Sequence, residues 1–424
     1  MFGGLLKSTS LAALVAVAGV AISGASAQAA DLGGNCCADL EERIAELEAT
    51  TARKGNRKVT LTVSGHVNEA VMFWDDGVES NAYITTNETA RSRFRFLGSA
   101  KIDSKWSAGY LIEIGVADNL QNTLSQNVSS TNSLAIRHSA WYLQNSDLGK
   151  VWVGQTSTST DGITEINLAS TGHFFGPATA SHNSLGFAFR RPSGATSSTV
   201  GAAFNAGGDG VNPGEGSRLN VVKYETPTLA GFIATAAWGE DDVFDVALRY
   251  AGEFSGFKLA AGIGYLQTND GTTNQRKCAR VAGAVDCNEL GLSASVMHVA
   301  TGLFVTGAYG RREDDLRAAG LDKTDDFYLI MGGIEQSFFP VGKTTLFGSY
   351  QEGSNHNGTA VVSGNTITTA EYSNWGLGFN QNIAAAVMDL YVNYNNYSYD
   401  LKAGAVDVPV NDFQTVVMGA RIQF

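Results

Sequence analysis

Three arginines alternate with other side chains in the segment ARSRFRF, residues 90–96. A guanidinium stays charged at neutral pH and only donates hydrogen bonds, so it binds or steers anions but does not act as a general base. In an extended chain, a spacing of two puts Arg91, Arg93 and Arg95 on one face and the phenylalanines on the other. The pattern predicts a strand whose basic face meets water, although an exposed basic strand end would show the same spacing.

Acidic side chains that could oppose these arginines occur in a long polar stretch, residues 156–184. Asp161 and Glu165 are the candidates, while solvated loop acids remain the alternative. Charges on the polar faces of the strands described below are also expected to line the interior. They are Glu113, Arg249 and Arg421, together with Lys258, Asp245 and Asp389. Arg190 and Arg191 would join them only if their segment is a loop.

Catalytic signatures are missing from the sequence. The six histidines include no H-E-x-x-H spacing, and there is no G-x-S-x-G motif or glycine-rich loop leading into a helix. His173 and His182 are interpreted as polar loop residues. The chain has 29 basic and 41 acidic residues, a balance that disfavours nucleic-acid binding. We therefore expect no enzyme activity, metal or cofactor.

Four cysteines fit an oxidising compartment. Cys278 and Cys287 lie in one polar segment and could close a small disulfide loop. Cys36 and Cys37 are adjacent, and the sequence assigns them no partner. Free thiols and a bridge to another chain stay equally open for this pair.

Most of the chain alternates apolar and polar residues with a period of two, which predicts β-strands with two different faces. In 106–115, the apolar face carries Trp106, Tyr110 and Ile112, and the opposite face carries Glu113. The segments 243–250, 257–265 and 388–395 alternate similarly. A soluble sandwich would turn the apolar face inward, whereas a membrane barrel would turn it toward lipid.

Three features favour an all-β, antiparallel transmembrane barrel. The strands are about ten residues long, aromatic residues recur near their ends, and short connections alternate with long polar ones. Residues 146–149 and 300–301 are tight, whereas 156–184, 268–288 and 352–369 are long. We expect 16 strands. The alternative is 18, if the weak segments 185–191 and 199–205 belong to the wall and are not a hairpin within the third loop.

One residue breaks the pattern of the first strand. Glu69 shares a face with Val63, Val67, Val71 and Phe73, which is the face expected to be apolar. A bulge or a contact between subunits would explain it, and the sequence does not decide between them.

The N-terminal residues differ from the rest. Residues 1–30 combine Lys7, an apolar run and A-x-A sites, which predicts a cleaved secretory signal peptide. Residues 31–58 contain a short helix, 39–52, with about two heptad repeats, followed by a basic linker. This helix is either a solvated leader or a small coiled coil between subunits. The predicted barrel occupies residues 59–424.

Three stretches resemble a known family. The last strand, DFQTVVMGARIQF, ends in Phe424 and resembles the signal that the outer-membrane assembly machinery reads. Residues 137–155 (RHSAWYLQNSDLGKVWVGQ) and 218–232 (RLNVVKYETPTLAGF) resemble elements of trimeric general porins, and the N-terminal heptads suggest the alphaproteobacterial type. Gly154-Gln155 lacks an arginine that the family pattern has there.

The resemblance implies a homotrimer in the outer membrane of a Gram-negative bacterium, surrounded by lipid, with a loop folded into each lumen. It implies passive diffusion of small hydrophilic solutes and ions. Two alternatives stay open: a substrate-specific channel, for which Tyr391, Tyr397 and Tyr399 could form a sugar-stacking track, and a structural protein that tethers the envelope.

Overall fold

The computed structural model describes most of the chain from residue 58 onward. The described residues are 58–172, 175, 184, 186–200, 212–239, 242–270, 284–316, 322–354, 361–362, 365–367, 369–403 and 405–424. The predicted signal peptide and nearly all of the predicted leader therefore lie outside the described residues, as do His173, His182 and three of the four cysteines, Cys36, Cys37 and Cys278.

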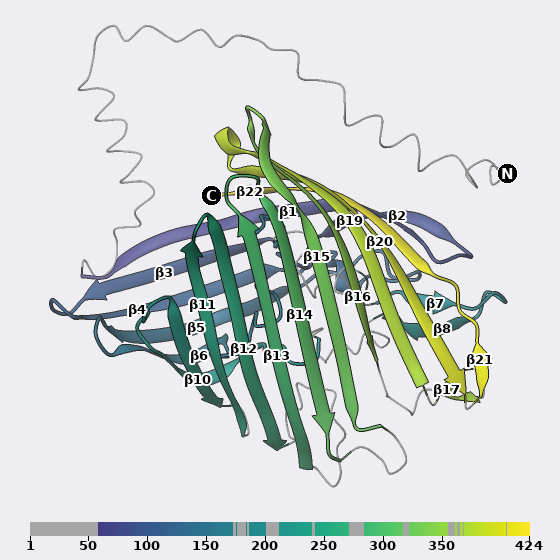
Figure 1. Ribbon diagram of the computed structural model, residues 1–424, viewed down its shortest axis with the longest axis horizontal. Helices are drawn as coiled ribbons and strands as arrows, with labels where there is room; N and C mark the ends of the chain where they lie inside the picture. The colour runs from purple at the N-terminus through teal and green to yellow at the C-terminus, as the bar shows by residue number, and fades with distance from the viewer. Residues whose placement is uncertain are drawn as a thin grey trace, which may run out of the picture. The chain divides into compact units, whose positions relative to one another are not determined.

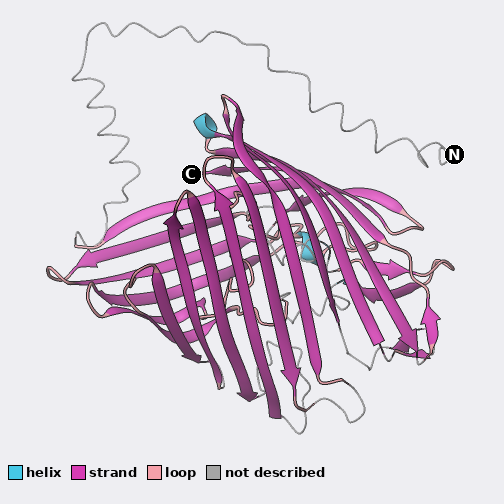
Figure 2. Cartoon of the chain, in the orientation of Figure 1, coloured by secondary structure: helices cyan, strands magenta, loops and turns pink. Residues whose placement is uncertain are grey.

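Strands form almost all of the described structure (Figure 2). The strands of the main sheet are β1 (Thr60–Asp75), β2 (Ser80–Thr86), β3 (Arg93–Lys101), β4 (Trp106–Val116), β5 (Leu134–Asn145), β6 (Gly149–Ser157), β9 (Arg218–Glu225), β10 (Phe232–Gly239), β11 (Val243–Phe254), β12 (Phe257–Asp270), β13 (Ala284–His298), β14 (Leu303–Asp314), β15 (Thr324–Phe339), β16 (Gly342–Ser354), β19 (Thr369–Ile383), β20 (Met388–Ala403), β21 (Val406–Val408) and β22 (Phe413–Gln423).

The remaining elements are short. Two hairpins stand apart from the main sheet, β7 (Ala188–Arg190) with β8 (Thr196–Thr199), and β17 (Val361–Val362) with β18 (Asn365–Thr366). Two single turns of 3-10 helix are η2 (Gln121–Thr123) and η4 (Ala384–Ala386). Among the described residues, no helix is both long and apolar enough to cross a membrane.

The main sheet closes into a barrel because β22 pairs antiparallel with β1 (Figure 1). β2 and β3 pair with successive parts of β1 and share one wall position. In the same way, β21 and β22 pair with successive parts of β20 and share one wall position. The barrel therefore has the 16 antiparallel strands that the sequence predicts. In the described part of the weak region, residues 186–200, β7 and β8 pair only with each other and stand outside the wall, so the 16-strand prediction holds over the 18-strand alternative.

The two faces of the wall follow the predicted alternation. On β11, Phe244 and Leu248 are exposed on the outside, whereas Asp245 is buried on the inside. On β4, Ile112 points outward and Glu113 inward. On these strands the outer face is thus apolar and the inner face polar, the reverse of a water-soluble sandwich.

The second wall position is interrupted between β2 and β3. Residues 87–92 leave the sheet there, and the backbone N–H of Asn87 still donates to the carbonyl of Asn68 on β1 (3.2 Å). Glu69 lies beside this break and accepts hydrogen bonds from the hydroxyls of Thr86 (2.9 Å) and Ser92 (2.7 Å). The anomalous outward glutamate of the first strand therefore bridges the two parted ends of its neighbour.

Residues 158–217, named loop 3 here, connect β6 to β9, and the described part that follows β6 runs along the inner wall. Thr160 donates to Asp245 on β11 (2.7 Å), Ser293 on β13 donates to the carbonyl of Ile163 (2.6 Å), and the N–H of Ser170 donates to Glu335 on β15 (2.7 Å). Loop 3 thus crosses successive strands inside the barrel.

Glycines on the inner wall allow this close approach. A Cβ added at Gly291 would collide with the carbonyl of Gly214 and lie 2.8 Å from Ile163. A Cβ at Gly310 would collide with the carbonyl of Pro213. Side chains at positions 291 and 310 would push loop 3 away from the wall and farther into the lumen.

Aromatic contacts fix the β7–β8 hairpin of loop 3 against the wall. The ring of Phe187 lies 5.3 Å from that of Trp74 on β1 and 5.0 Å from that of Phe413 on β22, between ring centroids. Phe189 contacts Tyr399 on β20, with centroids 5.3 Å apart. All five rings are buried, so the hairpin is anchored by apolar burial inside the barrel.

Candidate functional site

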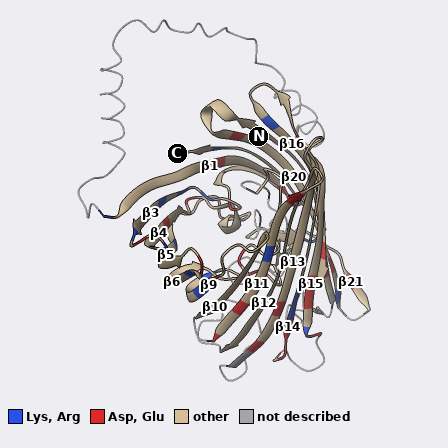
Figure 3. Ribbon diagram, turned by 60° about the vertical axis from the view of Figure 1, so that its left-hand side comes forward, with Lys and Arg blue, Asp and Glu red and all other residues tan. Residues whose placement is uncertain are grey.

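One buried carboxylate organises the arginines of the inner wall. Glu113 on β4 forms ion pairs with Arg93 of β3 (3.2 Å), with Arg137 of β5 (2.6 Å) and with Arg95 of β3. Arg95 and Glu113 are direct partners in the β3–β4 register, and Arg137 reaches them from the next strand. Blue and red segments lie close together around β3, β4 and β5 (Figure 3).

The interrupted wall strand supplies a further arginine. Asn87 donates to the hydroxyl of the buried Tyr391 on β20 (3.2 Å), so residues 87–91 fold toward the interior. Arg91 pairs with Glu88 (2.6 Å). A Cβ at Gly115 would lie 2.9 Å from Cδ of both Arg91 and Arg137, so the two stems pack over this glycine.

Loop 3 begins beside these residues. Its Asp161 lies 3.6 Å from Arg218 at the start of β9, and Arg249 of β11 donates to the carbonyl of Asp161 (2.9 Å). The charge of Arg218 also interacts with Glu113. We name Arg91, Arg93, Arg95, Arg137 and Arg218 the arginine cluster.

Both ends of loop 3 meet at one carboxylate. Glu215 accepts hydrogen bonds from the backbone N–H groups of Ile163 (3.1 Å) and Thr164 (2.7 Å), and also from that of Gly162 and the hydroxyl of Thr164. The returning end of the loop thereby holds the turn that carries Asp161. Glu215 is buried, and its two oxygens point into this turn.

The pKa values of Asp161, Glu165 and Glu215 shift in different directions, because these three acids are buried or half-buried close to one another. Burial opposes ionisation of Asp161, but Arg218 beside it and a hydrogen bond from Ser157 outweigh burial and lower its pKa. Burial and the negative charge of Asp161 raise the pKa of Glu165 to about 7. Burial, followed by the charges of Glu165 and Asp161, raises the pKa of Glu215.

The remaining predicted charges occupy other parts of the wall. Arg421 of β22 pairs with Asp389 of β20 (3.0 Å), and Lys258 of β12 is exposed. Arg190 belongs to β7 within loop 3, but its partner is Asp76 of the β1–β2 loop (3.0 Å). Its ion pair with Asp76 thus ties the hairpin to that loop and not to the arginine cluster.

Four members of the site were not among the sequence-predicted residues: Glu88, Arg137, Glu215 and Arg218. Arg137 and Arg218 carried a signal, because each opens one of the two internal stretches that resemble porins. Glu88 and Glu215 gave none, since loop acids are usually solvated. The expected opposition of arginines to Asp161 and Glu165 is incomplete, because the partner of Arg93 and Arg95 is Glu113 of the same wall.

The tyrosines considered as a sugar track point inward. Tyr391, Tyr397 and Tyr399 are all buried. Tyr391 donates to Asn68 (2.7 Å), and Tyr399 packs on Phe189 of loop 3. They form neither an interfacial girdle nor an exposed stacking surface.

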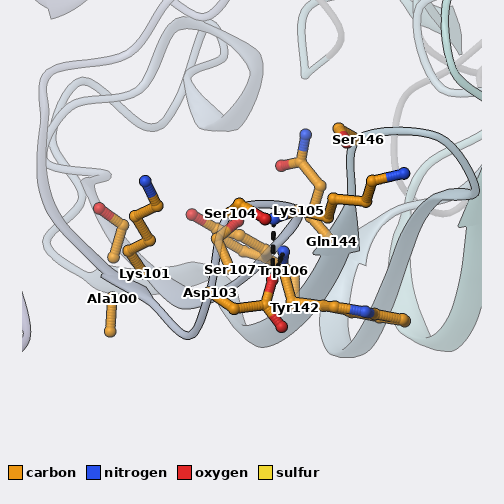
Figure 4. A pocket seen from close by; sticks show the side chains of 11 residues that line it. Ala100, Lys101, Asp103, Ser104, Lys105, Trp106, Ser107, Tyr142, Gln144 and Ser146 are labelled. Carbon is orange, nitrogen blue, oxygen red and sulfur yellow. Dashed lines mark hydrogen bonds between the residues drawn. The ribbon is translucent and has the colours of Figure 1, made fainter.

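A polar pocket occupies the barrel end that carries the short turns (Figure 4). It lies between the turn 102–105 and the β5–β6 turn, which Lys105 and Asp147 connect by an ion pair. Asp103 accepts hydrogen bonds from the backbone N–H groups of Lys105 and Trp106 (2.8 Å each). These contacts stabilise the turns, and within the described residues no group of His, Cys, Asp and Glu is arranged to hold a metal.

The fold is similar to those of solved outer-membrane channels, and the sequence matches a family model. No curated protein has a significantly similar sequence. The anion-selective porin from Comamonas acidovorans superposes with a TM-score of 0.57 at 17% identity, over 86% of this chain and 100% of that one. The channel DcaP of Acinetobacter baumannii gives 0.55 at 12% identity, over 88% and 100%. The family model for Gram-negative porins matches residues 10–406, and this chain therefore belongs to the Gram-negative porin family.

Proposed function

We propose that the protein is a general diffusion porin, through which small hydrophilic solutes and ions cross the outer membrane passively through a water-filled lumen. Membership of the porin family supports an outer-membrane channel. The observation that carries the finer proposal is the closed 16-strand wall, apolar outside and polar inside, with loop 3 folded along its inner face.

The polar inner wall and the arginine cluster would provide the solute pathway. A passive channel needs water-compatible walls and weak, multiple contacts, and no catalytic step. Arg95, Arg249 and Arg421 would line this pathway together with Asp161 and Glu165 of loop 3, and the buried Glu113 would hold Arg95 in place.

Three further features belong to the proposal. A homotrimer is supported by the predicted heptads of the leader and by a trimeric structural relative, OmpT of Vibrio cholerae. Phe424 would direct barrel assembly. Cys287 is buried at the loop end of β13, and its pairing with Cys278 stays a prediction.

Liposome swelling tests general diffusion. In proteoliposomes, uncharged sugars should enter at rates that fall smoothly with molecular size and that do not saturate with concentration. Rapid entry of one sugar, with competition by its analogues, would instead indicate a substrate-specific channel. No swelling with any sugar would contradict an open pore.

A further inference from the structure

The acids around the arginine cluster are withdrawn from solvent, whereas some of its arginines are not. The side chain of Glu113 is 0% exposed, and that of Asp161 is 16% exposed. By contrast, 45% of the Arg95 side chain and 33% of the Arg218 side chain are exposed. A solute in the lumen therefore meets guanidinium groups before it meets the carboxylates that hold them.

The arginines around Glu113 carry more positive charge than this single carboxylate can balance. One carboxylate carries a single negative charge, yet it pairs with Arg93, Arg95 and Arg137. The remaining two arginines each have one acid of their own, Glu88 for Arg91 and Asp161 for Arg218. Around the carboxylate of β4, the balance of formal charge is positive.

The other acids of loop 3 do not offset this excess. Glu215 is buried and directs its oxygens toward the N–H groups of residues 162–164. Glu165 is half-buried and has a pKa raised to about 7 by burial and by Asp161, so part of it is neutral near pH 7. Two further cations lie on the adjoining strands: Arg249 of β11 donates to the backbone carbonyl of Asp161 (2.9 Å), and Lys223 of β9 interacts electrostatically with Glu225 and Asp161.

We infer that the channel prefers small anions to cations of similar size, and that Arg95, the most exposed member of the arginine cluster, contributes most to this preference. The inference rests on the proposed open channel. It also runs against the net charge of the chain, −12, because long-range repulsion is screened within about 10 Å at moderate salt and local charges dominate.

The test is the reversal potential of the full-length protein in a planar bilayer under a KCl gradient. The wild type should show a chloride-over-potassium permeability ratio above one. Arg95→Gln should lower this ratio, and Arg95→Glu should lower it further. The matched control is Arg311→Gln, which removes an exposed arginine from the loop end of β14, on the same outward face as Leu303 and Val305.

Each result has one meaning. A silent bilayer with correctly folded protein contradicts the proposed channel itself. A conducting wild type with a ratio of one or below overturns the anion preference while the channel stands. If neither Arg95→Glu nor Arg311→Gln changes the chloride-over-potassium ratio, Arg95 is not the main source of the anion preference. Folding of each variant is checked by its heat-modifiable migration on gels.

Discussion

Glu113 is the residue on which the interior charges of β3, β4 and β5 depend. It is buried, and three guanidinium groups converge on its two oxygens. Removing one partner of a buried ion pair leaves charges without compensation, which costs about 3–5 kcal/mol in proteins. Its contribution is therefore structural as well as electrostatic.

Glu113→Gln should lower the free energy of unfolding by about 3 kcal/mol, because the arginines would then repel one another without a carboxylate between them. Urea unfolding of the barrel in detergent micelles measures this. Glu313→Gln, at the exposed loop end of β14, is the control and should change stability by less than about 0.5 kcal/mol. Equal stabilities of the two variants would contradict the central role of Glu113.

Glu165 should make the ion preference depend on pH. Its pKa of about 7 lies above the ordinary 4.5, so the fold favours its protonated form. The stability that the fold gains from protonated Glu165 is complete below about pH 4.5 and is lost as the pH rises through 7. As the pH rises from about 6 to 8, Glu165 ionises beside Asp161 and Glu215, and the chloride-over-potassium ratio should fall.

Reversal potentials measured at several pH values test this prediction. Glu165→Gln should flatten the pH dependence and keep the low-pH ratio. If the variant follows the same curve as the wild type, another group titrates in that range.

Loop 3 is the element that shapes the lumen, and its position depends on glycines of the wall. The carbonyl of Pro213 lies where a Cβ at Gly310 would be, whereas a Cβ at Gly307 on the same strand would lie 3.7 Å from the carbonyl of Leu329, an ordinary contact distance. The two glycines therefore form a matched pair, one beneath the loop and one away from it.

Gly310→Ala should displace the returning end of loop 3, and Gly307→Ala should not. Limited proteolysis of the folded protein should cut loop 3 faster in the first variant, and its single-channel conductance should change. Identical digestion patterns for the two variants would show that contact with Gly310 does not hold the loop.

The sequence predicted the two faces of the strands, but it did not predict the break between β2 and β3. The alternation in 106–115 and 243–250 identified the inner and outer faces. A strand that faces lipid on one side and water on the other needs apolar side chains on the first face and polar side chains on the second. Arg91, Arg93 and Arg95 looked like one continuous ladder, yet Arg91 precedes β3 in the segment that leaves the sheet. Glu69 signalled the break, but its partners Thr86 and Ser92 become neighbours only in the fold.

The ion pairs of the arginine cluster could not be predicted from the sequence either, because their partners also become neighbours only in the fold. Glu113 and Arg95 meet through the β3–β4 register, which the alternating pattern permits. Arg137 and Arg218 join them from β5 and β9, and Glu215 closes loop 3 over a separation of about fifty residues. No local pattern encodes such contacts, since they depend on the curvature of the closed wall.

The stability of the whole barrel depends on the apolar outer face of its strands. Leu248 lies in the middle of β11 and is exposed on the outer face with Phe244. Leu248→Arg should destabilise the barrel in lipid bilayers by about 2–4 kcal/mol, the cost of an arginine at mid-depth. Leu248→Ala, which shortens the side chain without adding charge, should cost clearly less in the same refolding assay. Equal costs would show that this face does not meet the membrane core.

On the proposed function, the closed wall encloses an open, passive, water-filled lumen. Single-channel conductance of the purified protein, recorded over a series of KCl concentrations, tests this most directly. We predict stepwise openings whose conductance rises in proportion to salt concentration, as it does in a wide aqueous pore. Persistent silence from correctly folded protein, or a conductance that saturates at low salt, would contradict it.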